Sequence, residues 1–164
     1  MGEQARCTDP HHHVHDGDAF VHEVERACEA RGLRLTPIRA HALRLIADAQ
    51  RPLKAYELLD LMKETHGSAA PPTVYRALDF LLEHGFIHKL ASINAFVGCH
   101  HPGSDVHAVP FLICDVCQSA VELEDERTVA SLEARARSLG FTPRAQTLEV
   151  HGTCAQCRSD SSAG

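Results

Sequence analysis

Cysteine and histidine side chains that can bind metal are concentrated in two short stretches of this sequence. Residues 99–117, CHHPGSDVHAVPFLICDVC, hold three cysteines and three histidines, and residues 154–157, CAQC, add a further Cys-x-x-Cys pair. Thiolates and imidazoles are preferred ligands of zinc. In a reducing compartment a Cys-x-x-Cys pair is typical of metal binding, and the odd total of seven cysteines argues against a complete disulfide framework.

The two Cys-x-x-Cys pairs have the same spacing and bracket a single segment of the chain. Each pair is expected at a strand end, where a tight turn lets both thiolates face one point. Four thiolates in a tetrahedron form a closed structural zinc site, which would pin the last strand of the segment to its first. The alternative is two independent reactive thiol pairs. We predict a structural zinc site with these four ligands: Cys114, Cys117, Cys154 and Cys157.

A second possible set of metal ligands is spread over a wider part of the chain: His88, Cys99, His100, His101, His107 and Glu122. A metal ion bound by members of this set would tie two domains together. One thiolate, two imidazoles and a carboxylate suit tetrahedral zinc, and a thiolate disfavours manganese and, less strongly, iron. Each side chain also has an interpretation without metal, because a single histidine on a strand is usually exposed or hydrogen-bonded, and a glutamate can be a solvated charge.

The elements that would position these ligands begin with three predicted helices. Apolar residues recur at helical spacing from Asp18, which we expect to cap the first helix. Pro37, after a threonine that suits the N-cap position, is typical of the first residue of a second helix. A third helical pattern covers residues 54–67.

A fourth helix and a hairpin complete the N-terminal pattern. The helix is expected to begin near Pro72 and end near Gly85, with its apolar residues on one face and a threonine, a tyrosine and an arginine in its first turns. Residues 86–92 and 94–99 alternate between apolar and polar and predict two short strands. Three helices, a fourth with a polar first turn, and a hairpin are typical of a winged helix-turn-helix.

The remaining sequence predicts a small unit of strand, turn, strand, helix and strand. Because it has only about 55 residues, it is too small to be stable on its core alone and would need a metal, a partner chain, or both. The predicted fold class is α+β. The predicted division is a disordered His-rich tail over 1–17, a winged-helix domain over 18–98, a hinge over 99–109 and a zinc-stapled unit over 110–158.

Charge and hydropathy narrow the class of function. The formal net charge is −6, but residues 31–90 carry nine Lys and Arg against six Asp and Glu, so positive charge is concentrated in the predicted winged helix, where phosphate contact would occur. No apolar run approaches the roughly 20 residues that a membrane span needs. The N-terminus is polar and unlike a signal peptide, and we expect a cytoplasmic protein.

Four motifs in this order resemble the ferric uptake regulator family of metal-dependent repressors. They are RLTPIR at 34–39, PPTVYRALDFLLEHGFIHK at 71–89, FLICDVC at 111–117 and HGTCAQC at 151–157. The second motif, followed by VGCH at 97–100, resembles the zinc uptake regulator branch more than the iron branch. The resemblance runs from about residue 18 to residue 158.

The resemblance implies a homodimer that binds palindromic operator DNA, with residues 110–158 as the dimerisation domain. It implies two zinc ions per chain: the structural zinc on the four cysteines, and a regulatory zinc whose ligands match His88, Cys99, His107 and Glu122. Because the spacing after Cys99 varies in the family, His100 or His101 can replace a neighbour as ligand.

On the DNA side, the resemblance implies that the fourth helix enters the major groove. Tyr75 and Arg76 match the family's base- and phosphate-contacting pair, and Arg76 suits bidentate reading of a guanine edge. Thr73, Arg39 and Lys54 are expected to contact phosphates. Asp60 and Lys63 form either a contact to a neighbouring dimer or, as we expect, an intrahelical ion pair.

The function predicted from the sequence is a zinc-responsive regulator that represses zinc-uptake genes when its regulatory zinc is bound. One alternative is an iron- or peroxide-responsive regulator of the same family, which the thiol of Cys99 disfavours. Another is a zinc-storing or zinc-transferring protein that uses the histidine cluster at 11–15. Enzymatic activity is disfavoured, because a catalytic zinc needs an open coordination position and the expected ligand set fills all four.

Overall fold

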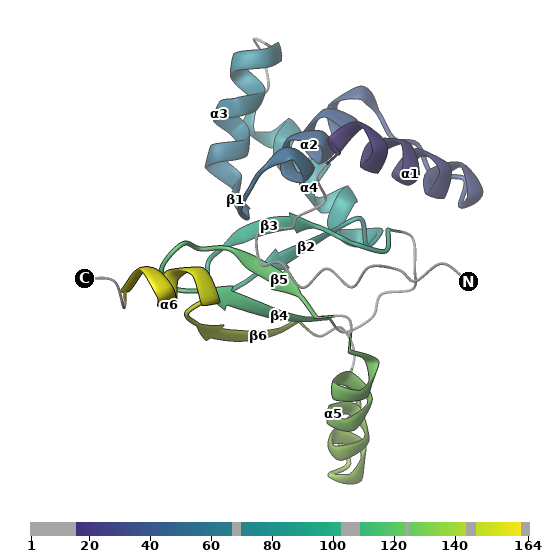
Figure 1. Ribbon diagram of the computed structural model, residues 1–164. Coiled ribbons are helices and arrows are strands. Elements are labelled where there is room, and N and C mark those ends of the chain that lie inside the picture. The colour runs from purple at the N-terminus through teal and green to yellow at the C-terminus, as the bar shows by residue number, and fades with distance from the viewer. Residues whose placement is uncertain (1–15, 67–69, 103–108, 124, 144–146, 162–164) are drawn as a thin grey trace, which may run out of the picture.

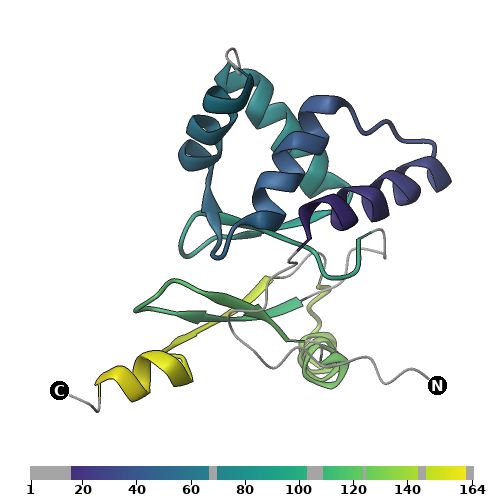
Figure 2. The same ribbon diagram turned by 45° about the horizontal axis from the view of Figure 1, so that its top comes forward.

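The chain folds into three layers, with helices above, a small sheet in the middle and a second sheet below (Figure 1). The computed structural model describes residues 16–66, 70–102, 109–123, 125–143 and 147–161. The same layers are visible after rotation in Figure 2. The fold is α+β, with a winged helix-turn-helix followed by a small C-terminal α/β unit, as the sequence predicted.

The elements follow one another in the order that the sequence predicted, with two additions. The helices are α1 Gly17–Ala30, α2 Pro37–Asp48, α3 Ala55–His66, α4 Pro71–Glu83, α5 Glu126–Ser138 and α6 Ala155–Ser161. The strands are β1 Leu53–Lys54, β2 Ile87–Leu90, β3 Ala95–Gly98, β4 Val109–Cys114, β5 Ala120–Glu122 and β6 Thr147–Gly152. Strand β1 and helix α6 are too short to produce a periodic signal, and the sequence did not predict them.

Helix α1 begins one residue before the predicted position and has a different N-cap. The carboxylate of Asp16 accepts hydrogen bonds from the backbone N–H groups of Asp18 and Ala19, both at 3.1 Å. The prediction that Asp18 caps this helix is therefore wrong, because an N-cap side chain must precede the first free N–H groups. Gly17 is the first residue of the helix, and residues 1–15 lie outside the described part.

Helix α4 begins one residue and ends two residues before the predicted positions. It ends at Glu83, and Gly85 then adopts a φ of +73°, which an L side chain rarely tolerates and glycine accepts without strain. The predicted apolar face is confirmed, since Val74, Leu78 and Leu81 are almost fully buried. This packing against α2 leaves the other face of α4 to the solvent.

The middle layer, here called the wing sheet, has the strand order β1-β3-β2, all antiparallel. It is buried on both faces. Ile87 and Phe96 belong to the core shared with the helices, whereas Leu90 and Val97 belong to a second core shared with the lower sheet. Since side chains alternate along a strand and His88 pairs with Val97, His88 faces the lower sheet.

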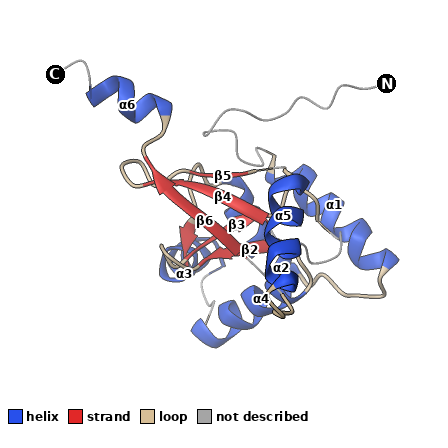
Figure 3. Cartoon of the chain, turned by 90° about the horizontal axis from the view of Figure 1, so that it is seen from below, coloured by secondary structure: helices blue, strands red, loops and turns tan. Residues whose placement is uncertain are grey.

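The lower layer, here called the C-terminal sheet, has the order β5-β4-β6, with β4 and β6 parallel. Helix α5 makes the crossover that a parallel pair requires. None of its residues, all of them described, is buried, and the helix projects away from the sheet (Figures 1 and 3). Helix α6 extends from the other end of the sheet (Figure 3).

Among the described residues, no helix combines the length and the apolar character that crossing a membrane requires.

Candidate metal sites and recognition helix

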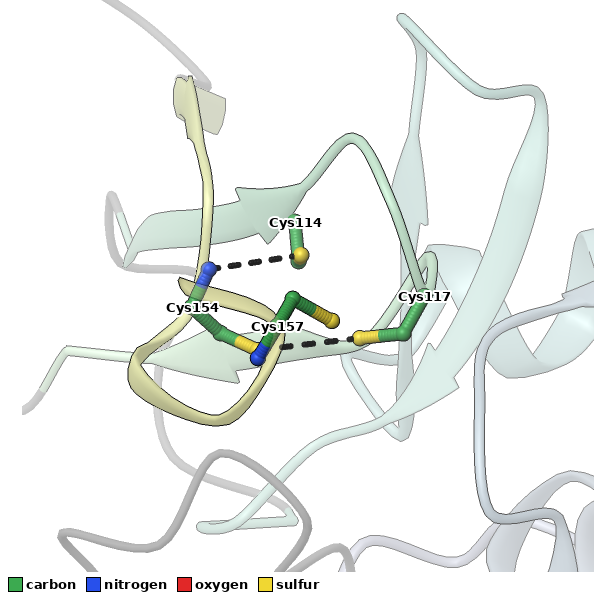
Figure 4. Close-up of side chains that lie close together, drawn as sticks. All are labelled: Cys114, Cys117, Cys154 and Cys157. Carbon is green, nitrogen blue, oxygen red and sulfur yellow. Dashed lines mark hydrogen bonds between the residues drawn. The ribbon is translucent and has the colours of Figure 1, made fainter. Parts of the chain in front are cut away.

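The C-terminal sheet brings the four predicted cysteines together (Figure 4). Cys114 is the last residue of β4 and Cys117 lies in the turn before β5, while Cys154 follows β6 and Cys157 lies in α6. Their sulfur atoms lie within 4.8 Å of one another. We call this group the four-cysteine cluster. It lies at the C-terminal ends of the parallel strands β4 and β6, and the zinc that would pin these strands together stays a prediction.

The local charges of the four-cysteine cluster suit a cation. Backbone N–H groups of Cys154 and Cys117 lower the pKa of the Cys114 thiol to about 6; the Cys154 N–H lies 3.3 Å from its sulfur. The crowding of the other thiols, Cys154 first, raises the pKa of Cys157 to about 12. One thiol therefore ionises readily and another resists, and a bound divalent cation is what would allow all four to ionise together.

A second group gathers between the wing sheet and the C-terminal sheet. His88 lies on β2, Cys99 directly follows β3, and Glu122 ends β5, with one potential ligand atom of each within 4.8 Å of the others. We call this group the His–Cys–Glu cluster. The backbone N–H of Cys99 donates to the carbonyl of Phe86 at 3.0 Å, which continues the hairpin and holds the thiol beside His88.

The His–Cys–Glu cluster is buried. Cys99 is 1% exposed and Glu122 is 8% exposed, and the Nε2 atom of His88 is also buried. The ring of His88 meets that of Phe111 on β4 edge to face, with centroids 5.4 Å apart. Burial, together with the nearby carboxylate of Glu122, raises the pKa of the Cys99 thiol to about 12. Burying a thiol, a carboxylate and an imidazole together is costly, and a divalent cation would offset this cost.

The other histidines predicted near this group have different outcomes. His107 lies outside the described residues. His100 is half-buried and approaches the cluster through its backbone, whose N–H donates to Glu122 at 3.4 Å. The side chain of His101 is exposed. The described part of the chain thus brings together three of the four residues predicted as ligands.

The first turns of α4 present the predicted DNA-contacting residues. Tyr75 is 53% exposed and Arg76 is exposed beside it, while Thr73 is half-buried. The two exposed side chains lie on the opposite side of the helix from buried Val74 and Leu78. A helix held by one face, with an aromatic and a basic side chain at its N-terminal end, has the geometry of a recognition helix.

The other predicted DNA contacts lie on neighbouring elements. The guanidinium of Arg39 on α2 stacks 3.6 Å above the ring of Phe80 and donates to the carbonyl of Arg34 at 2.8 Å, so its position against α4 is defined. Lys54 lies on β1, and its backbone N–H donates to Glu57 at the start of α3.

Asp60 and Lys63 lie three residues apart on α3, and their charged groups are 3.6 Å apart. The predicted intrahelical ion pair is confirmed.

Two further polar side chains, Glu149 and His151 on β6, contact the turn between β2 and β3. They were not among the candidates from the sequence. The alternation in TLEVHG places both on one face of the strand, but a polar face is ordinarily interpreted as facing solvent. Only the packing of the two sheets reveals that this face is covered.

The sequence matches the Ferric uptake regulator family over residues 30–151. A curated relative, the zinc uptake regulation protein of Escherichia coli (strain K12), is 43% identical over 135 residues, which cover 82% of this chain and 79% of that protein. Among solved structures, a zinc uptake regulator complexed with zinc and DNA is 40% identical and superposes with a TM-score of 0.84, covering 89% of this chain and 97% of the other.

A second solved relative is known in two forms. Holo XcZur is 68% identical and superposes with a TM-score of 0.82, over 87% of this chain and 99% of that one. The apo form of XcZur, with the same identity and the same coverage of this chain, superposes with a TM-score of only 0.52, over 98% of its own length. The arrangement described above therefore resembles the holo form more than the apo form. By its matched residues and its relatives, the chain belongs to the ferric uptake regulator family, within which it is similar to zinc uptake regulators.

Proposed function

We propose that the protein is a zinc-responsive transcriptional regulator, whose dimer binds palindromic operator DNA when its regulatory zinc is bound and then represses zinc-uptake genes. The observation that carries this proposal is the His–Cys–Glu cluster, in which ligands from the wing sheet and from the C-terminal sheet lie within 4.8 Å of one another. Similarity to a zinc uptake regulator complexed with zinc and DNA supports the binding of both zinc and DNA.

Two zinc ions per chain fit the donor atoms. The four-cysteine cluster has the closed, all-sulfur composition of a structural site. The His–Cys–Glu cluster supplies one sulfur, one nitrogen and one oxygen, and we assign His107 as its fourth ligand. The set contains a thiol and would provide four ligands, as tetrahedral zinc requires. It therefore favours zinc over the iron or manganese that other family members would bind.

Regulation would act through the position of the wing sheet. A zinc ion bound to His88, Cys99 and Glu122 would supply the charge that holds these three side chains together. We divide the chain into a DNA-binding domain over 18–98, a hinge over 99–109 and a dimerisation domain over 110–158. His88 precedes the hinge and Glu122 follows it, so holding the ligands together fixes the wing sheet, and α4 with it, on the dimerisation domain.

The fixed position of α4 affects DNA binding because the dimer must place two recognition helices at a defined distance. Two recognition helices enter successive major grooves only when they lie about 34 Å apart. If the DNA-binding domains are already held at that spacing, less ordering is required on DNA and affinity rises. Coupling of this kind between two ligands is typically about 5- to 150-fold.

The dimer interface would form on the surface of the C-terminal sheet that faces away from the wing. Leu112 on β4 and Val150 on β6 are 41% and 49% exposed on that face, and α5 adds Leu132 at 43%. Apolar side chains on neighbouring strands, beside a helix with no buried residue, are expected where a second copy of the chain packs.

On DNA, Tyr75 and Arg76 would reach base edges and phosphates from the first turns of α4. Thr73, Arg39 and Lys54 would contact phosphates and fix the register without reading sequence. We propose a cytoplasmic regulator without enzymatic activity, since the ligands of both clusters leave no position for a metal-bound water.

The test is DNA binding at buffered free zinc, on a palindromic duplex selected with the zinc-loaded protein. Cys99→Ser should keep the dimer and one zinc per chain, and lose the zinc-dependent gain of about 5- to 150-fold. Cys114→Ser should instead lose the structural zinc and the folded C-terminal sheet. Parent-like binding by Cys99→Ser at every zinc level would contradict the regulatory assignment.

A further inference from the structure

Glu149 joins the C-terminal sheet to the tip of the wing. Its carboxylate accepts two backbone hydrogen bonds from the turn between β2 and β3, at 2.6 Å from the N–H of Ala91 and at 3.0 Å from the N–H of Ser92. The residues are 57 and 58 positions apart in sequence. Hydrogen bonds to an ionised acceptor are about twice as strong as neutral ones.

The carboxylate of Glu149 is held in its ionised form. Burial alone would raise its pKa, but the hydrogen bonds from Ser92 and Ala91 together lower it below the ordinary value. The group therefore remains an acceptor of both wing N–H groups through the neutral pH range.

His151, two residues further along β6, makes a second contact to the same turn. Its Nε2 atom lies 2.8 Å from the hydroxyl of Ser92, and its Nδ1 atom lies 2.8 Å from the carboxylate of Asp115. Asp115 directly follows Cys114, and its own N–H donates to the carbonyl of Gly152 at 2.8 Å. The ring is thus oriented by the turn that carries the four-cysteine cluster.

The register of the C-terminal sheet aligns Glu149 and the proposed metal ligand Glu122 across its three strands. The two residues stand at opposite ends of one row of paired residues. Phe111 on the central strand pairs with Glu122 on β5 and with Glu149 on β6. Since neighbouring strands lie about 4.8 Å apart, the two carboxylate-bearing residues are about 10 Å apart across the sheet. Phe111 lies between them and contacts His88.

The two residues at the ends of this row contact opposite ends of the β2–β3 hairpin. His88 and Cys99 lie at the base of the hairpin and meet Glu122, whereas Ala91 and Ser92 lie at its tip and meet Glu149. From His88 to Ala91 the strand extends about 10 Å, which matches the spacing of the row. A metal at the base would hold the wing at one point, and a second attachment at the tip restricts rotation about that point.

We propose that Glu149 and His151 form a metal-independent latch on the wing tip, and that they are positioning residues for DNA binding in addition to the zinc ligands. The inference rests on the proposed function, since it concerns the arrangement in which the regulator binds DNA. The latch favours the same arrangement that gathers His88, Cys99 and Glu122. By linkage, it should therefore strengthen both zinc binding at that cluster and DNA binding.

The test compares Glu149→Gln with Glu25→Gln, a substitution of an exposed glutamate on α1 that removes the same charge. Glutamine keeps the size of the side chain but offers a neutral acceptor. We expect Glu149→Gln to weaken operator binding at saturating zinc by about 5- to 30-fold, the loss expected when two charge-assisted hydrogen bonds become weaker neutral ones. Because removing a negative charge by itself strengthens DNA binding, the control should bind equally well or better.

Two further measurements separate positioning from a loss of folding. Glu149→Gln should remain a dimer with full structural zinc, and its affinity for zinc at the His–Cys–Glu cluster should fall several-fold. Ser92→Ala, which removes the side-chain contacts of Ser92 to His151 and Glu149 but keeps both backbone N–H groups, should give a smaller loss, of about threefold. Unchanged DNA and zinc affinities in Glu149→Gln would overturn the proposal.

Hydrogen exchange tests the latch even if the proposed function fails. The amides of Ala91 and Ser92 should exchange faster in Glu149→Gln than in the parent, with the zinc-depleted as well as the zinc-loaded protein. Equal exchange at both amides would rule out the latch. Faster exchange in Glu149→Gln than in the parent, combined with a parent that shows no zinc-dependent DNA binding, would keep the latch and contradict the regulatory function instead.

Discussion

Single residues in this protein acquire their chemistry from burial. A cysteine on the surface would have an ordinary thiol pKa, but Cys99 is buried beside Glu122, and both effects favour the protonated thiol. Metal binding must displace that proton. The same burial that makes the metal-free cluster costly therefore makes its affinity for zinc dependent on pH.

The residue-scale prediction concerns this dependence. Since the pKa of Cys99 is raised to about 12, its thiol carries a proton throughout the neutral range in the metal-free protein. Each unit of pH decrease from 8 to 6 should lower the apparent zinc affinity at the His–Cys–Glu cluster by about tenfold or more, because at least one proton competes. Competition with a fluorescent zinc chelator at several pH values measures this slope. A pH-independent affinity would show that the thiolate is not a ligand.

At the scale of elements, the strands of the two sheets differ in how polar and apolar side chains alternate between their faces. In β3, Ala95, Phe96 and Val97 are all buried, so both faces of this strand are covered and its sequence shows little alternation in polarity. In β6 the polar side chains Glu149 and His151 face the wing, and the apolar side chains Leu148 and Val150 face outward. This reversal has a physical reason, since the outward face is where a second chain would pack.

The element-scale prediction follows from that exposed apolar face. Leu112→Glu on β4 should convert the dimer to a monomer, because a charge would be buried against the partner's apolar side chains. The monomer should keep its structural zinc and lose operator binding by at least about 100-fold, since two half-sites are no longer linked. Sedimentation measures the oligomeric state, and zinc content reports on folding.

Tyr56→Glu is the matched control for this prediction. Tyr56 is a large exposed side chain, at 60%, but it lies on α3 and away from the C-terminal sheet. The control should remain dimeric. If Leu112→Glu also remains dimeric at micromolar concentration, the interface lies on another surface.

At the scale of the whole molecule, the wing sheet is the connection between recognition and regulation. One of its faces belongs to the helical core that carries α4, and its other face belongs to the core of the C-terminal sheet. Any change in how the two sheets meet therefore moves α4 as well. The lower similarity to apo XcZur than to holo XcZur fits two arrangements of one fold.

The whole-molecule prediction uses a chelator mild enough to leave the structural zinc in place. Removing the regulatory zinc should increase the radius of gyration measured by X-ray scattering, and adding zinc back should restore it. Cys99→Ser should give the larger radius at every zinc level. An identical radius with and without regulatory zinc in the parent would mean that zinc does not select between arrangements.

The sequence by itself determined the elements and the four-cysteine cluster. Helices α1 to α5 and the wing strands β2 and β3 follow from local periodicity and from residues such as Gly85, whose backbone conformation is set by neighbours in sequence. The cysteine pairs are equally local, since each Cys-x-x-Cys sits in one turn. Their equal spacing was sufficient to predict that both pairs face one point.

Only the tertiary structure decided which polar residues meet across the two sheets. His88, Cys99 and Glu122 were candidates in the sequence, but residue spacing left their interpretation open. Glu149 and His151 were not recognised at all, because their contacts join positions more than 50 residues apart. Contacts of this kind depend on the register of β4 with β5 and β6, and on which face the wing covers. No pattern within a single segment encodes either of these.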